Sequence, residues 1–212
     1  MSKLCPIIII GGGGHASVLV DILIRQNRTI KAVISPDCIR SRRVFRETLR
    51  LKSDSDIESY APRDVLLVNG IGPSPRLNVR QEVNNYFIEK GYQFETVISD
   101  SAQVSSHAVL SEGVQILQGA IVQAGVVIGE HSIINTGAIV EHDSCLGSYN
   151  HVAPNATLCG QVTTGQNVYV GAGAVVINNM TIGTNSVVGA GATLTSSLGA
   201  GRTCYPSRAL IK

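Results

Sequence analysis

A six-residue repeat runs through nearly half of the chain and limits what the chain can fold into. Steps of six residues from Val104 to Leu194 reach sixteen positions, and every one except Thr164 is Val, Ile or Leu. The residue two positions before each of these is small or aliphatic in most hexads. Because side chains alternate across a strand, two inward positions per hexad predict a three-residue strand followed by a three-residue corner. An amphipathic helix would need a period near 3.6 residues and does not fit.

Three such hexads make one triangular coil, so the repeat predicts a parallel β-helix of about five coils, on the order of 25 Å tall. Residues that tolerate positive φ are expected at its corners. Glycine directly follows the aliphatic position in several hexads, at Gly129, Gly147, Gly171, Gly183 and Gly189. Asparagine stands near the end of others, at Asn135, Asn155, Asn167, Asn179 and Asn185. We expect both groups to supply the corner conformations.

The composition suits a thin, regular fold and excludes several classes of partner. Aromatic residues make up only 4%, there is no Trp, and 22 glycines are present, so the core is built from Val, Ile, Leu and Ala. A net charge of +2 with 15% charged residues argues against nucleic acid or an anionic membrane as partner. Six basic residues between positions 40 and 52 are expected to form either a solvated surface segment or a phosphate contact.

The cysteines and the first residues bear on the compartment. Five scattered cysteines, an odd number with no CxxC pair, argue against a zinc ribbon or a redox site and favour a reducing cytoplasm. The apolar run Ile7–Ile10 is too short for a signal peptide or a membrane span. We therefore expect a cytoplasmic protein that is neither exported nor inserted in a membrane.

Residues 1–98 predict a small Rossmann-like domain. Apolar runs predict strands at Ile7–Ile10, Ile30–Ile34, Val65–Val68 and Phe94–Ile98. Helices are expected at Ser17–Gln26 and from an N-cap at Ser74 to Lys90, with Pro75 in the first turn and Gly91 as terminator.

A glycine-rich turn in this domain resembles a phosphate-binding loop. Gly11-x-Gly13-x-x-Ala16 matches the dinucleotide fingerprint, in which backbone N–H groups approach a pyrophosphate at a helix N-terminus. Ser35-Pro36 stands where an acidic residue is expected after the second strand, and the domain is too short for two mononucleotide halves. The turn therefore predicts one bound diphosphate rather than NAD, and a glycine turn that only connects strand to helix is the alternative.

One histidine in the repeat has charged neighbours. Positions 102–197 contain no Lys or Arg and four acids, of which Glu141 and Asp143 flank His142. A corner exposes its side chains, and an adjacent carboxylate can orient an imidazole as a general base. An inert surface histidine is the alternative. His151 lies at an outward strand position nine residues later, which is half a coil away. The two histidines could therefore share a site only between two chains, as in a cyclic trimer.

These residues resemble a known family. The run from Asn135 to Gly147, NTGAIVEHDSCLG, followed by His151-Val152-Ala153-Pro154, is similar to the sialic acid O-acetyltransferase (NeuD) family of hexapeptide-repeat acyltransferases. That family includes the UDP-4-amino-sugar N-acetyltransferases of bacillosamine synthesis and the perosamine N-acetyltransferases. The similarity extends over nearly the whole chain. It implies a left-handed parallel β-helix in residues 99–197, after the Rossmann-like nucleotide-sugar-binding domain, with a C-terminal tail, 198–212, near CoA.

The resemblance also implies an activity and a set of site residues. It implies acetyl-CoA-dependent N-acetylation of the 4-amino group of a nucleotide-linked sugar, with O-acetylation of a sialic acid or a related sugar hydroxyl as the alternative. The separation of the two histidines predicts a homotrimer for this enzyme. His142 would be the general base and Asp143 the residue that increases its basicity. Contacts with acetyl-CoA are implied for His151, Gly160, Ala172, Ala190 and Arg208. Contacts with the nucleotide sugar are implied for Gly13, Gly14, His15, Ser35, Pro36 and Gly70. Two departures from the family pattern are Ser207, where Ala is usual, and Ser35-Pro36, where an acidic pair is often found.

Two other functional classes share these features. The γ-type carbonic anhydrases use the same repeat with a metal held by three histidines, but their close His-x4-His pair is missing here, so no metal is expected. A non-catalytic nucleotide-sugar-binding accessory protein is the other alternative, and the intact Glu141-His142-Asp143 segment argues against it. The identity of the sugar, and the choice among UDP, GDP and dTDP, stay open at this point.

Overall fold

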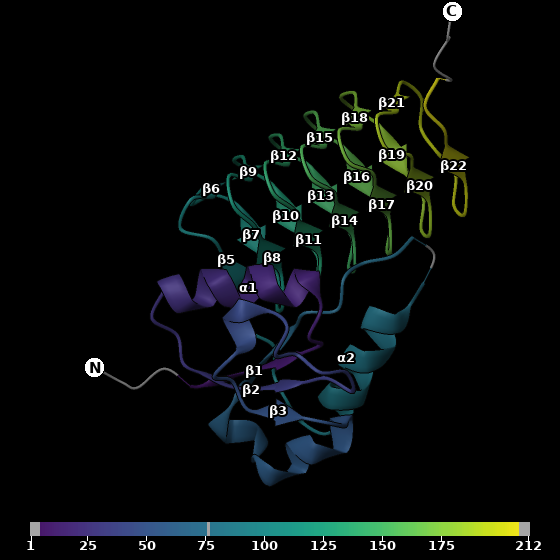
Figure 1. The fold of residues 1–212 in the computed structure, drawn as a ribbon. Coiled ribbons are helices and arrows are strands. Elements are labelled where there is room, and N and C mark those ends of the chain that lie inside the picture. Colours follow the sequence, from purple (N-terminus) through teal and green to yellow (C-terminus); the bar gives the residue numbers. More distant parts are fainter. Residues whose placement is uncertain (1–4, 76, 208–212) are drawn as a thin grey trace, which may run out of the picture. The chain divides into compact units, whose positions relative to one another are not determined.

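The structure is a computed structural model that describes residues 5–75 and 77–207. The chain divides into two compact units, with the boundary between Val97 and Ile98 (Figure 1). The first unit is a Rossmann-like α/β fold and the second is a left-handed parallel β-helix, so the predicted fold class is confirmed. Among the described residues, no helix is long and apolar enough to cross a membrane.

The first unit is built on a four-stranded parallel sheet with the order β3-β2-β1-β4. Its strands are β1 (Ile7–Ile10), β2 (Ile30–Ile34), β3 (Arg50–Leu51) and β4 (Leu66–Asn69). The helices are α1 (Gly14–Arg25) and α2 (Val79–Glu89), with 3-10 helices η1 (Arg43–Phe45), η2 (Asp54–Ser59) and η3 (Pro62–Asp64). All four residues of β1 are buried, as expected for an interior strand of a parallel sheet.

Three predicted elements of this unit are wrong in their limits. Helix α1 begins at Gly14 and not at Ser17, so the last residues of the glycine-rich segment are helical. Helix α2 begins after an N-cap at Asn78, because Ser74 closes a separate turn in which the Leu77 N–H donates to the Ser74 carbonyl. The segment Phe94–Ile98 does not complete the sheet as one strand. Phe94 makes a single parallel bridge to Leu67, whereas Val97–Ile98 forms β5 and pairs in a β-helix sheet.

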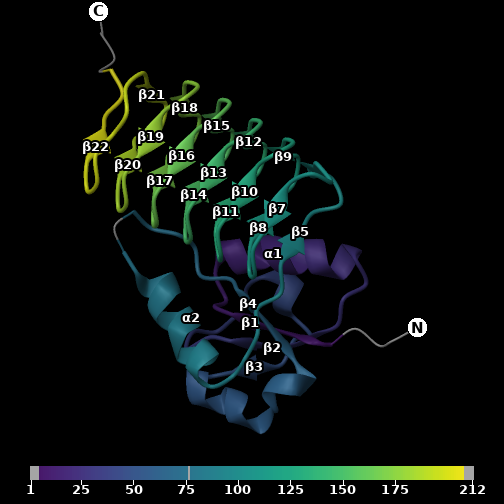
Figure 2. The same ribbon diagram turned by 180° about the vertical axis from the view of Figure 1, so that it is seen from behind.

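The β-helix has three faces, each a parallel sheet of two-residue strands (Figure 2). The first face comprises β6 (Gln103–Val104), β9 (Ile121–Val122), β12 (Ile139–Val140), β15 (Thr157–Leu158), β18 (Val175–Val176) and β21 (Thr193–Leu194). The second face comprises β7 (Val109–Leu110), β10 (Val127–Ile128), β13 (Cys145–Leu146), β16 (Thr163–Thr164) and β19 (Thr181–Ile182). The third face comprises β5 (Val97–Ile98), β8 (Gln115–Ile116), β11 (Ile133–Ile134), β14 (His151–Val152), β17 (Tyr169–Val170), β20 (Val187–Val188) and β22 (Thr203–Cys204).

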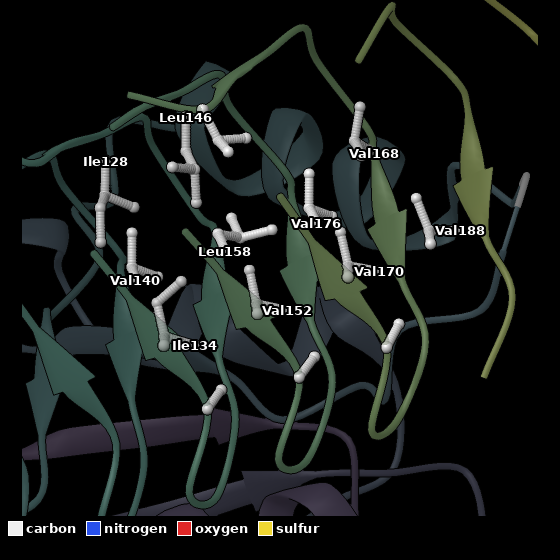
Figure 3. Packing of buried hydrophobic residues seen from close by; sticks show 14 of the residues in the cluster. Ile128, Ile134, Val140, Leu146, Val152, Leu158, Val168, Val170, Val176 and Val188 are labelled. Atoms are coloured by element: carbon white, nitrogen blue, oxygen red, sulfur yellow. The ribbon is translucent and has the colours of Figure 1, made fainter. Parts of the chain in front are cut away.

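The aliphatic residues of the repeat form the core of this prism. Their side chains point into the space that the strands enclose, and successive coils stack them in rows (Figure 3). The register places residues eighteen apart side by side, for example Val140 beside Val122 and Leu158. The two inward positions predicted for each hexad are therefore confirmed in Ala138 and Val140, which are both fully buried.

The corners follow a stricter rule than the sequence predicted. The third residue after the aliphatic position has positive φ in fourteen consecutive hexads: Gly113, Gly119, Gly125, His131, Gly137, Asp143, Tyr149, Asn155, Gln161, Asn167, Gly173, Asn179, Asn185 and Gly191. The prediction is thus right for four of the five asparagines. It is wrong for Asn135, whose side chain instead accepts a hydrogen bond from the Thr136 N–H.

The five glycines that follow the aliphatic position were also assigned the wrong role, because none of them has positive φ. They share another property, which is that the neighbouring coil leaves no room for a side chain at their positions. A Cβ atom built on Gly147 would lie 2.7 Å from the carbonyl carbon of Gly165, and one on Gly129 would lie 2.6 Å from that of Gly147. These glycines let the backbone of one coil approach the backbone of the next.

We expect Gly147→Ala to destabilise the β-helix by about 1–3 kcal/mol, because the added methyl group meets backbone that cannot move aside. The free energy of unfolding from chemical denaturation measures this. Gly199→Ala is the matched control, since its Cβ would meet only Arg202, at 3.9 Å. Equal stability of the two variants would contradict the close-approach explanation.

Candidate active site

The acidic segment of the repeat forms one corner of the prism. Glu141, His142 and Asp143 connect β12 on the first face to β13 on the second. The backbone of this corner is held by the coils on both sides, because the Asp143 N–H donates to the Ala124 carbonyl and the His142 carbonyl accepts from the Gln161 N–H. The corner is therefore rigid in its backbone, and its side chains reach solvent.

The imidazole of His142 and the carboxylate of Asp143 form a hydrogen-bonded pair. Nδ1 of His142 lies 2.9 Å from Oδ2 of Asp143, and each side chain is 59% exposed. Asp143 is the positive-φ residue of this corner, with φ of 59°. A carboxylate at Nδ1 holds the proton on that nitrogen and leaves Nε2 as the basic atom of the neutral ring. This arrangement is the one a general base needs.

Gly160 occupies the place below His142 in the next coil, eighteen residues on. It is buried, and a Cβ atom built on it would lie 2.6 Å from Nε2 of the imidazole. The structure therefore brings three of the predicted site residues together, namely His142, Asp143 and Gly160.

The other predicted acetyl-CoA contacts lie elsewhere in the β-helix. Ala172 and Ala190 are exposed and occupy the corner between the third and first faces, where they stand eighteen residues apart in successive coils. That corner and the His142 corner border the same first face. Arg208 lies outside the described residues.

His151 is outward on the third face, as predicted, but it is buried. Only 5% of its surface is exposed, its ring packs against Tyr169 with centroids 4.8 Å apart, and Nε2 lies 3.0 Å from the side-chain amide nitrogen of Asn135. Within one chain His151 lies on the third face, whereas His142 lies at the corner between the first and second faces. Its predicted contact with acetyl-CoA remains a prediction.

The first unit contains a cavity of about 450 Å³ at the carboxyl ends of β1 and β2. Three of the predicted nucleotide-sugar contacts, Gly13, Ser35 and Pro36, line it. Gly13 is also the N-cap of α1. A Cβ atom on Gly13 or Gly14 would meet nothing within 4 Å, so packing does not require glycine at either position. Their bare backbone leaves the helix N-terminus open to a phosphate.

The remaining predicted contacts in this unit do not line the cavity. Gly14 and His15 follow Gly13 in the first turn of α1. Gly70 is buried, and a Cβ atom on it would lie 2.6 Å from Cβ of Ala16, so its small size allows the end of β4 to pack against α1.

Three charged residues also line the cavity, and the two acidic ones were not predicted from the sequence. The three are Asp37, Arg42 and Asp54. Partial burial raises the pKa of the Asp54 carboxyl. Arg42 belongs to the basic run that was expected to be either a solvated segment or a phosphate contact, and it is the member of that run that lines this cavity. Asp54 lies in η2, which the strand and helix patterns did not predict.

Metal-binding geometry is not found in residues 5–75 and 77–207. No group of three or more His, Cys, Asp or Glu side chains among them is close enough to hold a metal ion.

Comparisons with known proteins place the chain among acetyltransferases. The family model described as bacterial transferase hexapeptide (six repeats) matches residues 161–196, whereas no curated protein sequence matches the chain. The solved structure of PerB from Caulobacter crescentus in complex with CoA and GDP-perosamine is 31% identical, covering 93% of this chain and 92% of that one, with a TM-score of 0.83. A variant of perosamine N-acetyltransferase from Caulobacter crescentus with one histidine replaced by asparagine, also with CoA and GDP-perosamine, is 30% identical over 95% and 93% of the two chains, with a TM-score of 0.85.

A more distant structure agrees in fold. The acetyltransferase domain of PglB from Neisseria gonorrhoeae, in complex with acetyl coenzyme A, has a TM-score of 0.85 and covers 97% of this chain and 98% of that one. At 23% identity this likeness concerns the fold alone.

Proposed function

Because the chain belongs to the family of hexapeptide-repeat sugar N-acetyltransferases that includes the Caulobacter crescentus perosamine enzyme, we propose that it acetylates a nucleotide-linked amino sugar. Acetyl-CoA is the donor and the sugar amine is the acceptor. The observation that carries the proposal is the exposed His142–Asp143 pair, in a chain that resembles an enzyme solved with CoA and GDP-perosamine over nearly its whole length.

In the proposed mechanism His142 is the general base. Nε2 takes a proton from the amine as the amine nitrogen attacks the thioester carbonyl carbon of acetyl-CoA. Asp143 holds the Nδ1 proton and stabilises the imidazolium that forms. Collapse of the tetrahedral intermediate breaks the C–S bond, and the CoA thiolate leaves. A deprotonated amine is already a good nucleophile, so one base and correct positioning suffice without a covalent enzyme intermediate.

The cavity of the first unit is the proposed site for the nucleotide part of the acceptor. The diphosphate lies at the N-terminus of α1, where Gly13 and Gly14 leave the backbone N–H groups accessible. Arg42 supplies the positive charge of this site. The carboxylates of Asp37 and Asp54 can accept the N–H groups of a guanine edge, and a GDP-linked amino sugar is accordingly the first acceptor to test.

Reaction with acetyl-CoA also bears on the location of the protein. The five free cysteines are compatible with a reducing compartment, and we place the enzyme in the cytoplasm, where acetyl-CoA is available.

The activity is tested by measuring CoA release with acetyl-CoA and a panel of GDP-, UDP- and dTDP-linked amino sugars and sialic acids. We expect acetylation of an amine and not of a sialic acid hydroxyl. His142→Ala should lower kcat by about 10²- to 10⁴-fold, the usual contribution of general-base catalysis, with folding unchanged because the side chain is exposed. Asp143→Asn should lower kcat less, since it keeps the shape and removes only the charge. A folded His142→Ala protein with wild-type kcat at neutral pH would remove the base from this mechanism.

The nucleotide site is tested with Arg42→Ala. Loss of a guanidinium from a phosphate should raise KM for the nucleotide sugar by about 10-fold and leave KM for acetyl-CoA unchanged. Arg46→Ala is the matched control, because Arg46 is exposed in the same basic run but does not line the cavity. An equal effect of the two substitutions, or an effect on acetyl-CoA alone, would argue against this assignment.

We further propose that the protein is a homotrimer with active sites between subunits. The second face exposes an uncharged row that includes Val109 and Val127, which are 59% and 40% exposed. This row borders the His142 corner, and a cyclic contact there would bring a different face of a neighbouring chain to His142.

Light scattering should therefore give a mass of three chains for the wild type. Val109→Glu combined with Val127→Glu should yield smaller species with reduced kcat, because two charges would be buried in the contact. Leu49→Glu in the first unit, at a residue that is 54% exposed, should change neither mass nor kcat. A fully active monomer would contradict the proposal.

A further inference from the structure

We propose that Gly160 and Gly125 are positioning residues that hold the His142–Asp143 pair in its reactive arrangement by lacking a side chain. The inference rests on the proposed role of His142 as general base. Neither glycine donates or accepts the proton. Each leaves the space that one member of the pair occupies.

The imidazole lies directly against the backbone of Gly160. Strand β12 pairs in register with β15, so residue 160 follows residue 142 in the next coil. A Cβ atom at position 160 would lie 2.6 Å from Nε2, 2.7 Å from Cε1 and 3.3 Å from Cδ2 of His142. The first two distances are shorter than any contact that a real methyl group makes. Any residue other than glycine would therefore displace the ring.

The fold itself does not require glycine at position 160. Its φ is not in the left-handed region. The same corner position, two residues after the aliphatic one, holds a non-glycine residue in every other hexad: Ser106, Glu112, Gln118, Ala124, Glu130, Thr136, His142, Ser148, Pro154, Gln166, Ala172, Asn178, Thr184, Ala190 and Ser196. The feature that distinguishes position 160 is the imidazole above it.

Gly125 has the corresponding relation to Asp143 on the other side of the corner. Strand β10 pairs in register with β13, and a Cβ atom on Gly125 would overlap Oδ1 of Asp143. Gly125 also has φ of +75°, so the turn alone favours glycine there. Its effect on the carboxylate must therefore be separated from backbone strain by a control.

The two glycines together determine which way the pair can face. The carboxylate occupies the space over Gly125, the ring occupies the space over Gly160, and the Nδ1–Oδ2 hydrogen bond of 2.9 Å joins them. A methyl group at 160 can be avoided only if the exposed ring swings into solvent. That movement costs little stability, but it takes Nε2 away from its position, and a displacement of about 1 Å can reduce a rate about 100-fold.

A double-mutant cycle on the full-length enzyme tests the proposal, with kcat and both KM values measured for the wild type, Gly160→Ala, His142→Ala and the double variant. We expect Gly160→Ala to lower kcat by about 10-fold or more. KM for acetyl-CoA should stay unchanged, because the contact with acetyl-CoA that the resemblance implies for Gly160 is made by its backbone, which alanine keeps. The unfolding midpoint should also stay unchanged. In the His142→Ala background, Gly160→Ala should have no further effect on kcat. Gly199→Ala controls for an added methyl group at an open position.

The other outcomes are distinct. A Gly160→Ala enzyme with wild-type kcat would overturn the inference while leaving the proposed function intact. An increase in KM for acetyl-CoA, with losses that multiply in the His142→Ala background, would overturn it as well, because Gly160 would then act through the donor. Wild-type kcat in His142→Ala would instead refute the base assignment and, with it, the inference.

Gly125→Ala provides an independent measurement. Gly119→Ala is its matched control, because Gly119 has φ of +67° and its Cβ would meet nothing within 4 Å. Both substitutions should lower the unfolding midpoint through backbone strain. Only Gly125→Ala should also lower kcat, to the level of Asp143→Asn, and weaken the NMR signal of the His142 Nδ1 proton. Equal kcat values in the two variants would show that Gly125 serves the turn alone.

Discussion

The parallel hydrogen-bond ladder between successive coils is the interaction on which the rest of the β-helix depends. The N–H of Ile139 donates to the Ala156 carbonyl, and the N–H of Cys145 donates to the Val162 carbonyl, at 2.9 Å in each case. Each residue is thereby placed against the residues eighteen positions before and after it. The residues that contact each other in neighbouring coils can thus be found by counting eighteen positions along the chain. Gly160, which lies against the imidazole of His142, is an example.

The same ladder determines which positions point into the core and serve the fold, and which lie at corners and can carry reactive side chains. Inward positions such as Ala138 and Val140 are fully enclosed and accept only residues that fill the prism. Corner side chains point away from the core, so ion pairs and bases can be placed there at little cost in stability. Asp143 combines both demands, because it has the positive φ that the turn needs and carries the carboxylate that contacts His142. Aspartate tolerates that conformation better than most residues do.

The predictions from the sequence that were wrong concern features that depend on contacts between segments distant in the chain. The glycines after the aliphatic position were expected to supply positive φ, but they serve the close approach of neighbouring coils, which depends on stacking distance. The outward position of His151 was predicted, whereas its burial was not, because alternation says which way a side chain points and not what covers it. Asp54 was not predicted to line the cavity of the first unit, because η2, in which it lies, carries no periodic signal.

The sequence by itself determined the repeat, the two fold types and the corner at which His142 and Asp143 stand side by side. These follow from periodicity and from adjacency in the chain, which are local properties. Only the tertiary structure decided that the imidazole lies over Gly160 and the carboxylate over Gly125, and that Asp54 and Arg42 line one cavity. Those relations arise when segments far apart in sequence are brought to contact distance, and the positions of their atoms then depend on coil register and packing, which no residue specifies alone.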